Sequence, residues 1–297
     1  MTATQAMSVP EKIRRRRGAS SGGNAGIGSR PGFLTYGLLA AFIIGSVYPM
    51  WWSLVVASGD NSTRGETLPL IPGGNFFANA AKVLDAIPFW LALGNSIIVS
   101  SVITISVVTF STLAGYAFAK LRFRGREGLM VFVVATMAIP TQLGIIPLFM
   151  LMRELGWTGS IGAVIIPTLV TAFGVFFMRQ YLVDVIPDEL LEAARVDGAN
   201  QFRTFLTVGL PAARPAMAIL GLFTFMTAWT DYLWPLIVLP PQNPTLQTAL
   251  SQLQSGYYID YSIVLAGAVM ATLPLLLLFV VAGKQLVSGI MAGAVKG

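Results

Sequence analysis

The groups of this chain that could do chemistry are carboxylates and aromatic rings, because the sequence contains no histidine and no cysteine. A serine–histidine pair, a thiolate nucleophile and a zinc site built from the usual ligands are therefore excluded. The carboxylates of interest lie in two settings. Glu192 and Asp197 belong to a polar segment at 186–211, and Asp231 stands among aromatic residues. We expect no catalytic residue and no metal site, so the expected role is binding or the transmission of motion.

The first half of the polar segment 186–211 predicts a short helix. Pro187 suits the first helical position, and Asp188 and Glu189 place negative charge at the positive end of the helix dipole. Gly198 suits the left-handed residue that commonly ends a helix. The expected helix therefore covers about 187–197.

A second helix is expected to begin near Asn200 and to end before Pro211. In the first helix, a spacing of i, i+3, i+4 and i+7 places four residues on one side: Leu190, Ala193, Ala194 and Asp197. The opposite side carries Glu189, Glu192 and Arg195. Two alanines on one side allow close approach by another surface, so this helix-turn-helix would be a rigid lever that passes motion from a soluble partner to membrane helices.

The composition indicates that these residues are positioned by membrane-spanning helices. Hydrophobic residues are 55% of the chain, charged residues are 11%, and the mean hydropathy is +0.72. Soluble domains carry about 25% charged residues, so this chain has too little polar surface to cover itself. A soluble enzyme, a disordered region and a disulfide-stapled secreted domain are excluded, and an all-α polytopic membrane protein is expected.

Six apolar stretches are long enough to cross about 30 Å of hydrocarbon. They run approximately from 33–57, 94–119, 128–152, 160–181, 213–238 and 262–283. The first is too long for the core of a signal peptide and is interpreted as an uncleaved anchor. The polar segment, as loop 182–212, therefore connects the fourth and fifth spans.

Basic residues predict the orientation. With a cytoplasmic N-terminus, all but three of the 19 Lys and Arg residues lie on the cytoplasmic side, the exceptions being Arg64, Lys82 and Arg153. This bias predicts that both termini are cytoplasmic. It also explains the net charge of +6 by topology, so nucleic acid is not an expected partner.

The regions outside the spans divide the chain. Residues 1–32 are rich in Gly, Ser and Arg and are expected to be a disordered basic cytoplasmic tail, leaving 33–297 as one membrane domain. The outside loop 58–93 is expected to lie on the membrane surface or to pack on a partner, since its turn residues stand among apolar ones.

Several polar and aromatic residues near or within the spans are candidates for a substrate pathway. An ionised carboxylate at mid-bilayer costs about 2.5–3.5 kcal/mol on insertion scales, but Asp231 lies about 25 Å along a helix from Arg214, at ~1.5 Å per residue, and thus near the outer interface. There Trp229, Tyr232 and Trp234 form either an ordinary aromatic belt or a surface on which a substrate stacks.

Two amide side chains are also open to a structural and a functional interpretation. Asn95 and Gln142 are either hydrogen-bonding groups between helices or ligands of a polar substrate. Gln142 stands between Pro140 and Pro147, where freed backbone carbonyls could line a cavity.

The polar segment also resembles a known family. The pattern consists of Glu192-Ala193-Ala194, then three residues and Gly198, then nine residues and Val208, Leu210 and Pro211. It is similar to the EAA motif of bacterial ABC-importer membrane subunits, with Val208 where isoleucine is common. The longer pattern at 192–199, which includes Asp197, resembles the carbohydrate branch, the maltose-type permeases.

The resemblance extends over nearly the whole chain. The matching stretches are Gly94-Asn-Ser96, Gly115-Tyr-Ala-Phe-Ala-Lys120, Trp229-Thr-Asp-Tyr-Leu-Trp-Pro235 and the C-terminal Val287–Gly297. It implies a permease subunit that forms a heterodimer with a second permease subunit, two ATPase subunits that bind ATP and Mg, and an extracellular or periplasmic sugar-binding protein. This chain itself would bind no cofactor, would contact membrane lipid, and would lie in the bacterial inner membrane.

Carried over residue by residue, the resemblance makes 192–198 a coupling helix seated in a cleft of the ATPase subunit. Glu192 would anchor it by ionic contacts, Ala193 and Ala194 would permit close packing, and Gly198 would set the turn. The substrate class implied is a di- or oligosaccharide moved by alternating access. The alternatives are a solvated amphipathic connector for this segment and an ATP-independent secondary transporter or channel for the chain.

Overall fold

The computed structural model describes residues 32–60 and 70–294, and every regular element in these ranges is a helix. The expected all-α fold is confirmed for this part, while the expected disordered tail lies almost wholly outside it. The chain divides into two units, Met1–Tyr48 and Pro49–Gly297. The boundary falls inside α1 (Phe33–Ala57), so every later helix belongs to the second unit.

By length and composition, five of the described helices could cross a membrane. They correspond to the first, second, fourth, fifth and sixth expected spans and cover Phe33–Ala57, Phe89–Lys120, Ile161–Val185, Gln201–Thr230 and Tyr261–Val280. Of these, α3 (Phe89–Lys120) is one unbroken helix, and α13 runs on to Ala294. The direction in which they cross stays a prediction.

The third expected span, 128–152, is not one helix. It consists of α4 (Arg126–Met137), a 3₁₀ turn at Thr141–Gly144 and α5 (Ile145–Glu154), and the two parts are bent by 89°. Pro140 explains the break, because it has no N–H to donate and its ring disfavours helix in the residue before it. Hydropathy detected the apolar length but not the change of direction.

The fourth span also contains a local irregularity. It is built from α6 (Ile161–Ile165), a 3₁₀ turn at Ile166–Thr168 and α7 (Ala172–Val185). The hydroxyl of Thr171 caps α7 by accepting a hydrogen bond of 3.1 Å from the backbone N–H of Gly174.

The fifth span differs from the expectation at both ends. The helical path begins with α9 (Gln201–Thr204), passes through a π-helical turn at Phe205–Gly209 and continues as α10 (Leu210–Thr230). The prediction that the second helix of the polar segment ends before Pro211 is therefore wrong, because Pro211 occupies the first turn of α10, where a missing N–H is tolerated. The expected end at 238 is also wrong.

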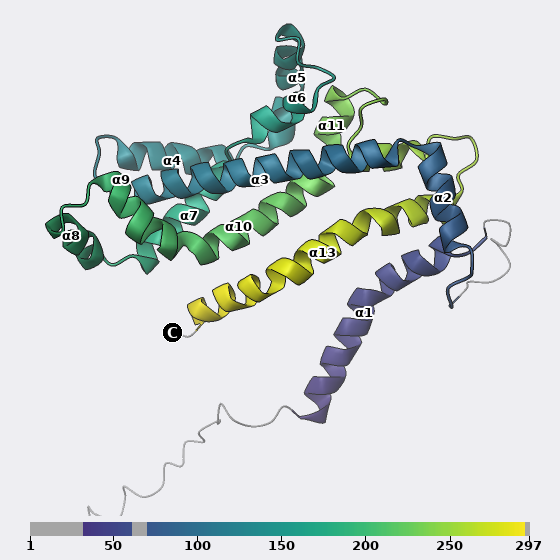
Figure 1. Cartoon of the computed structure of the whole chain (residues 1–297), viewed down its shortest axis with the longest axis horizontal. Helices are drawn as coiled ribbons and strands as arrows, with labels where there is room; N and C mark the ends of the chain where they lie inside the picture. The colour runs from purple at the N-terminus through teal and green to yellow at the C-terminus, as the bar shows by residue number, and fades with distance from the viewer. Residues whose placement is uncertain (1–31, 61–69, 295–297) are drawn as a thin grey trace, which may run out of the picture. The chain divides into compact units, whose positions relative to one another are not determined.

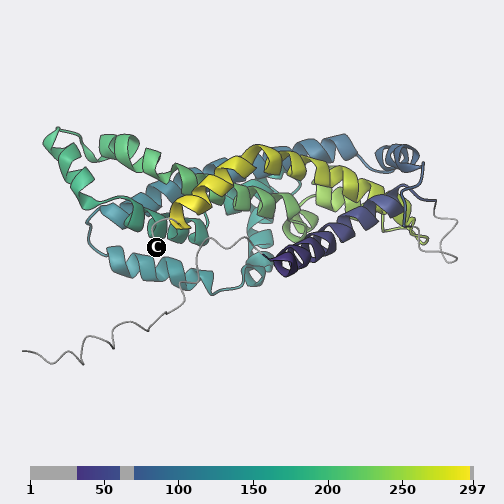
Figure 2. The same cartoon turned by 90° about the horizontal axis from the view of Figure 1, so that it is seen from below.

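Short helices lie at both ends of the unit, with α8 (Asp188–Val196) and α9 at one end and α2 (Phe76–Ala86) at the other (Figures 1 and 2). Of the remaining short helices, α11 (Leu233–Val238) packs on α5 and α6, and α12 (Leu246–Gln252) packs on α3 and α13. In the loop 58–93, residues 76–86 form α2, which packs on α13 and buries Val83 completely. Its expected contact with the membrane surface or with a partner stays a prediction.

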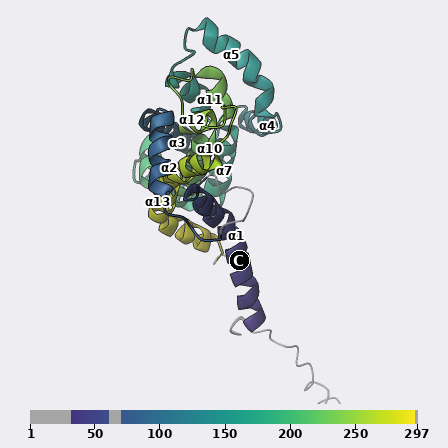
Figure 3. The ribbon, with the colours of Figure 1, turned by 90° about the vertical axis from the view of Figure 1, so that its right-hand side faces the viewer.

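The core forms where α3 packs against α7 and α10, which are seen together nearly end-on in Figure 3. The contact of α3 with α7 is close because two glycines face it. A Cβ added to Gly115 would lie 2.7 Å from the Cβ of Met178 and 2.8 Å from the backbone nitrogen of Arg179, and one added to Gly174 would meet Ser111. Met178 itself is fully buried at this crossing.

The crossing predicts that Gly115→Ala destabilises the protein by about 1–3 kcal/mol, the usual range for an overpacked interior, because the obstructing atoms include backbone. Gly94→Ala is the matched control, since it lies in the same helix with no atom within 4 Å of its added Cβ. Thermal denaturation of the purified variants in detergent measures the difference. Equal midpoints for the two variants would contradict the close packing of α3 and α7.

Candidate functional site

The first half of the polar segment forms the expected helix almost residue for residue. It covers Asp188–Val196, with Pro187 as its N-cap rather than its first residue. Gly198 has a φ of +79°, which favours glycine. The N–H of Ala199 donates to the carbonyl of Ala194 at 2.9 Å and that of Gly198 to the carbonyl of Arg195 at 3.0 Å, the pairing of a Schellman motif.

Two apolar side chains fasten this helix to the body of the protein. Ile186, just before α8, is 1% exposed, and Leu191 is 5% exposed. Both belong to the cluster that contains Met178 and Leu182 of α7. The connector is therefore packed against the core and is not a loosely attached loop.

The predicted small-residue side of α8 faces a depression. A hollow of about 330 Å³ is lined by residues of α8 and of the helical path that follows: Leu190, Ala193, Ala194, Asp197, Ala199, Arg203, Thr207 and Val208. Five of the residues singled out from the sequence, Leu190 among them, thus meet at one place. Glu192 is exposed outside this lining, as the predicted opposite side requires.

The remaining residues of the spaced pattern lie further along. Leu210 is partly buried and packs against the core, while Pro211 is exposed at the first turn of α10. Because the helical path is continuous from Gln201 to Thr230, the part of the lining formed by Arg203, Thr207 and Val208 belongs to the same rod as the fifth span.

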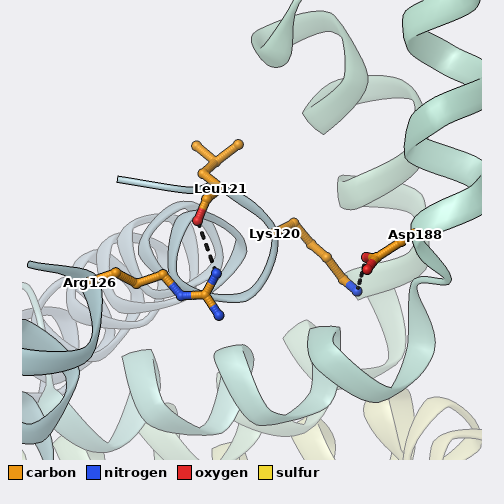
Figure 4. A network of polar contacts seen from close by, with 4 residues as sticks. All are labelled: Lys120, Leu121, Arg126 and Asp188. Carbon is orange, nitrogen blue, oxygen red and sulfur yellow. Dashed lines mark hydrogen bonds and ion pairs between the residues drawn. The ribbon is translucent and has the colours of Figure 1, made fainter. Parts of the chain in front are cut away.

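An ion pair that the sequence did not predict ties α8 to α3. The ammonium of Lys120, the last residue of α3, donates to Oδ1 of Asp188 at 3.0 Å (Figure 4). The Lys120 side chain is only 8% exposed, but that of Asp188 is 78% exposed. The hydrogen bond and the positive charge of Lys120 hold the pKa of the Asp188 carboxyl below its ordinary value of 3.8.

A second polar contact closes the end of α3. A guanidinium N–H of Arg126 donates to the carbonyl of Leu121 at 3.2 Å, which satisfies one of the acceptors that a helix leaves open at its C-terminus (Figure 4). No local pattern could have paired Lys120 with Asp188, because 68 positions separate them. The one available signal was a lysine at the end of a predicted span.

Among the candidates for a substrate pathway, Asn95 is engaged with backbone and side chain of the loop before α12. Its Nδ2 donates to Oδ1 of Asn243 at 2.8 Å and to the carbonyl of Pro244 at 2.9 Å. The neighbouring Ser96 hydroxyl accepts from the N–H of Leu246 at 2.8 Å. These contacts fit the interpretation of Asn95 as a hydrogen-bonding group of the fold.

The two tryptophans in the candidate set lie in the interior. Trp229 is 1% exposed and stacks on Phe225 with ring centroids 5.7 Å apart. Trp234 is 7% exposed and donates from Nε1 to the carbonyl of Ala163 at 3.1 Å. In this conformation neither ring offers a face to a solute.

The other three candidates are more accessible. Asp231 ends α10, and its carboxylate interacts with the backbone N–H groups at the start of α11. Tyr232 is 41% exposed beside it. Gln142 is exposed in the 3₁₀ turn between α4 and α5.

Comparison with known proteins identifies relatives along most of the chain. Residues 108–288 match the family described as "Binding-protein-dependent transport system inner membrane component". The chain is 35% identical over 263 residues to the arabinooligosaccharides transport system permease protein AraQ of Halalkalibacterium halodurans, which covers 86% of this chain and 93% of that protein.

A second relative and a solved structure are also similar to this chain over most of its length. The lactose transport system permease protein LacG of Rhizobium radiobacter is 33% identical over 269 residues, covering 90% of this chain and 97% of LacG. A chain from the crystal structure of a bacterial ABC transporter involved in the import of the acidic polysaccharide alginate superposes with a TM-score of 0.71 at 27% identity, covering 84% of this chain and 94% of that one.

The ion pair between α3 and α8 predicts an asymmetry between its two partners. Asp188→Asn leaves a mostly buried ammonium without its counter-charge, whereas Lys120→Met leaves a carboxylate that water can solvate. Asp188→Asn is therefore expected to lower the thermal midpoint of the purified protein more than Lys120→Met. The reverse order would show that the pair does not hold α8.

The same pair predicts a pH dependence. Because folding lowers the pKa of Asp188, its contribution to stability is complete above the unfolded value and is lost as the pH falls through the lowered folded value. The gap in thermal midpoint between wild type and Asp188→Asn should thus be constant at neutral pH and close in acid. If the gap persists in strong acid, the difference in thermal midpoint does not come from the charge of the Asp188 carboxylate.

Proposed function

Because the chain belongs to the family of binding-protein-dependent transport system inner membrane components, we propose that it is the membrane permease subunit of an ABC importer that brings a di- or oligosaccharide into the cell. The observation that carries the proposal is the hollow beside α8, whose lining includes four residues of the family's spaced motif and its longer form: Ala193, Ala194, Asp197 and Val208. Such a surface is suited to receive a protein partner.

The partners follow from this role. We expect a second permease subunit to complete a heterodimeric pathway, two ATPase subunits to bind ATP and Mg at the cytoplasmic side, and an extracellular or periplasmic binding protein to deliver the sugar. The chain would lie in the inner membrane with both termini in the cytoplasm, as its basic residues predict.

In this assembly α8 would be the coupling helix. Glu192, exposed on its outer side, would make ionic contacts with the ATPase subunit, and Ala193 and Ala194 would let the two surfaces approach closely. Gly198 supplies the left-handed turn that sets the angle between α8 and the rod that begins at Gln201. The rod supports the transmission of motion, because a displacement at α9 reaches α10 without crossing a flexible joint.

Alternating access completes the proposed mechanism. Closure of the ATPase dimer on ATP would draw the coupling helices together and open the pathway outward to receive sugar, and hydrolysis would reset it. Within this chain, the bend between α4 and α5 and the exposed side chain of Gln142 beside it would contribute to the lining of the pathway.

The substrate class rests on the relatives. AraQ and LacG are named for the transport of arabinooligosaccharides and lactose, and the structural relative for the import of alginate. A sugar would meet Tyr232, Asp231 and Gln142 as the accessible members of the candidate pathway set.

Charge reversal at the proposed anchor tests the coupling role. Glu192→Lys should abolish uptake and sugar-stimulated ATP hydrolysis in the reconstituted complex. The lysine would place a positive charge against the group of the ATPase subunit that is proposed to pair with the Glu192 carboxylate. The variant should still insert into the membrane in normal amount. Glu189→Lys, which reverses an exposed charge one turn away on the same helix, is the control and should keep most of the activity.

The proposed coupling role of Glu192 is wrong if the complex that carries Glu192→Lys transports sugar normally. If this chain instead moves solute without ATP and without the binding protein, the ABC-importer proposal itself is wrong. A panel of arabinooligosaccharides, lactose and other disaccharides, applied to the wild-type complex, would identify the substrate from the sugar that stimulates hydrolysis.

The hollow itself can be tested by filling it. Ala193→Trp would occupy the depression and should weaken binding of the ATPase subunit at least tenfold, an order of magnitude typical of a disrupted interface centre. Val196→Trp is the matched control on the same helix, since Val196 is 88% exposed and does not line the hollow. Co-purification of the ATPase subunit with each variant gives the measurement, and equal losses for both would argue against this docking surface.

A further inference from the structure

A groove of about 460 Å³ lies between α3, α4 and α7, and none of its lining residues belongs to α8 or to the candidate pathway set. Most of its lining is apolar and comes from one helix face of α4 together with one phenylalanine each from α3 and α7: Phe118, Met130, Val131, Val134 and Phe176. The three helices meet at this place because α4 packs along α7 beside α3 (Figure 1).

The polar residues of the groove are all charged and lie at one end of it. They are Arg126, Glu127 and Arg179. The Nε of Arg179 is buried without a hydrogen-bond partner in the described residues, while one of its other nitrogens donates to Gln180 at 3.2 Å. Arg126 uses one nitrogen for the carbonyl of Leu121. A guanidinium has five N–H donors, so both arginines keep donors for a further acceptor.

This end of the groove coincides with the end of the apolar spans. The helix α3 stops at Lys120 and α4 starts at Arg126, and the exposed residues between them include Arg122 and Arg124. From Arg126 to Val134 the groove follows α4 for about 12 Å at ~1.5 Å per residue. The charged end therefore lies at headgroup depth and the apolar part extends toward the hydrocarbon.

We propose that this groove is a binding site for an anionic phospholipid, with phosphatidylglycerol as the best fit. The phosphodiester would accept hydrogen bonds from Arg126 and Arg179, an acyl chain would lie against Val131, Val134 and Phe176, and the Glu127 carboxylate would accept from headgroup hydroxyls. The chemistry of the lining disfavours a sugar, whose many hydroxyls would find no partners in the apolar part. The site is independent of the proposed transport function.

The test is native mass spectrometry of the full-length chain purified in mild detergent and titrated with phosphatidylglycerol or phosphatidylcholine of the same acyl chains. We expect one phosphatidylglycerol to be retained in clear preference to phosphatidylcholine. Arg179→Gln should reduce that retention about fivefold, the effect expected for one arginine at a lipid surface. Val131→Trp should reduce retention of the bound lipid by filling the groove without changing the charge.

The matched control is Arg124→Gln, which removes one guanidinium charge near the same end of the spans but from a residue that does not line the groove. It should retain the lipid as the wild type does. The proposal is overturned if Arg124→Gln and Arg179→Gln weaken retention equally, if Val131→Trp has no effect, or if millimolar inorganic phosphate displaces the lipid, because each result would indicate surface charge or a free anion site in place of a lipid groove.

Discussion

The close approach of α3 and α7 is the constraint on which the rest of the structure depends. At Gly115 the backbone of Met178 and Arg179 occupies the space that a side chain would need. This contact fixes where α3 ends and where α7 leads, and so it brings Lys120 to the start of α8 and Arg179 to the groove beside α4. The features at this end of the molecule are consequences of one glycine-mediated crossing.

The polar segment 186–211 is attached to the rest of the protein at both ends, in different ways. On its N-terminal side, Ile186 and Leu191 are buried in the core and Asp188 is paired with Lys120, so α8 follows α3 and α7. On its C-terminal side, the segment is continuous with the fifth span through the helical path from Gln201 to Thr230. Under the proposed function, a push on α8 therefore acts on two groups of spans, joined only through the turn at Gly198.

Local signals were sufficient for α8, because a proline, two acidic residues and a glycine at fixed spacing specify its start, its faces and its end. Local signals did not predict a change in the direction of a helix or a contact between residues far apart in the sequence. Hydropathy does not detect the bend at Pro140, and a helix breaker such as Pro211 is tolerated once a π-helical turn precedes it. The pair between Lys120 and Asp188 depends on the three-dimensional crossing and has no counterpart in local sequence.

Several residues chosen by their type as pathway candidates are held within the fold. Asn95, Trp229 and Trp234 are all suited to a sugar, yet the first holds the loop before α12 and the tryptophans fill the interior. A polar group in a span must satisfy its hydrogen bonds before it can serve a ligand. Since Asn95 is engaged in hydrogen bonds and both tryptophan rings are buried, the proposed sugar pathway needs contacts from a companion subunit in addition to those that Tyr232, Asp231 and Gln142 can make.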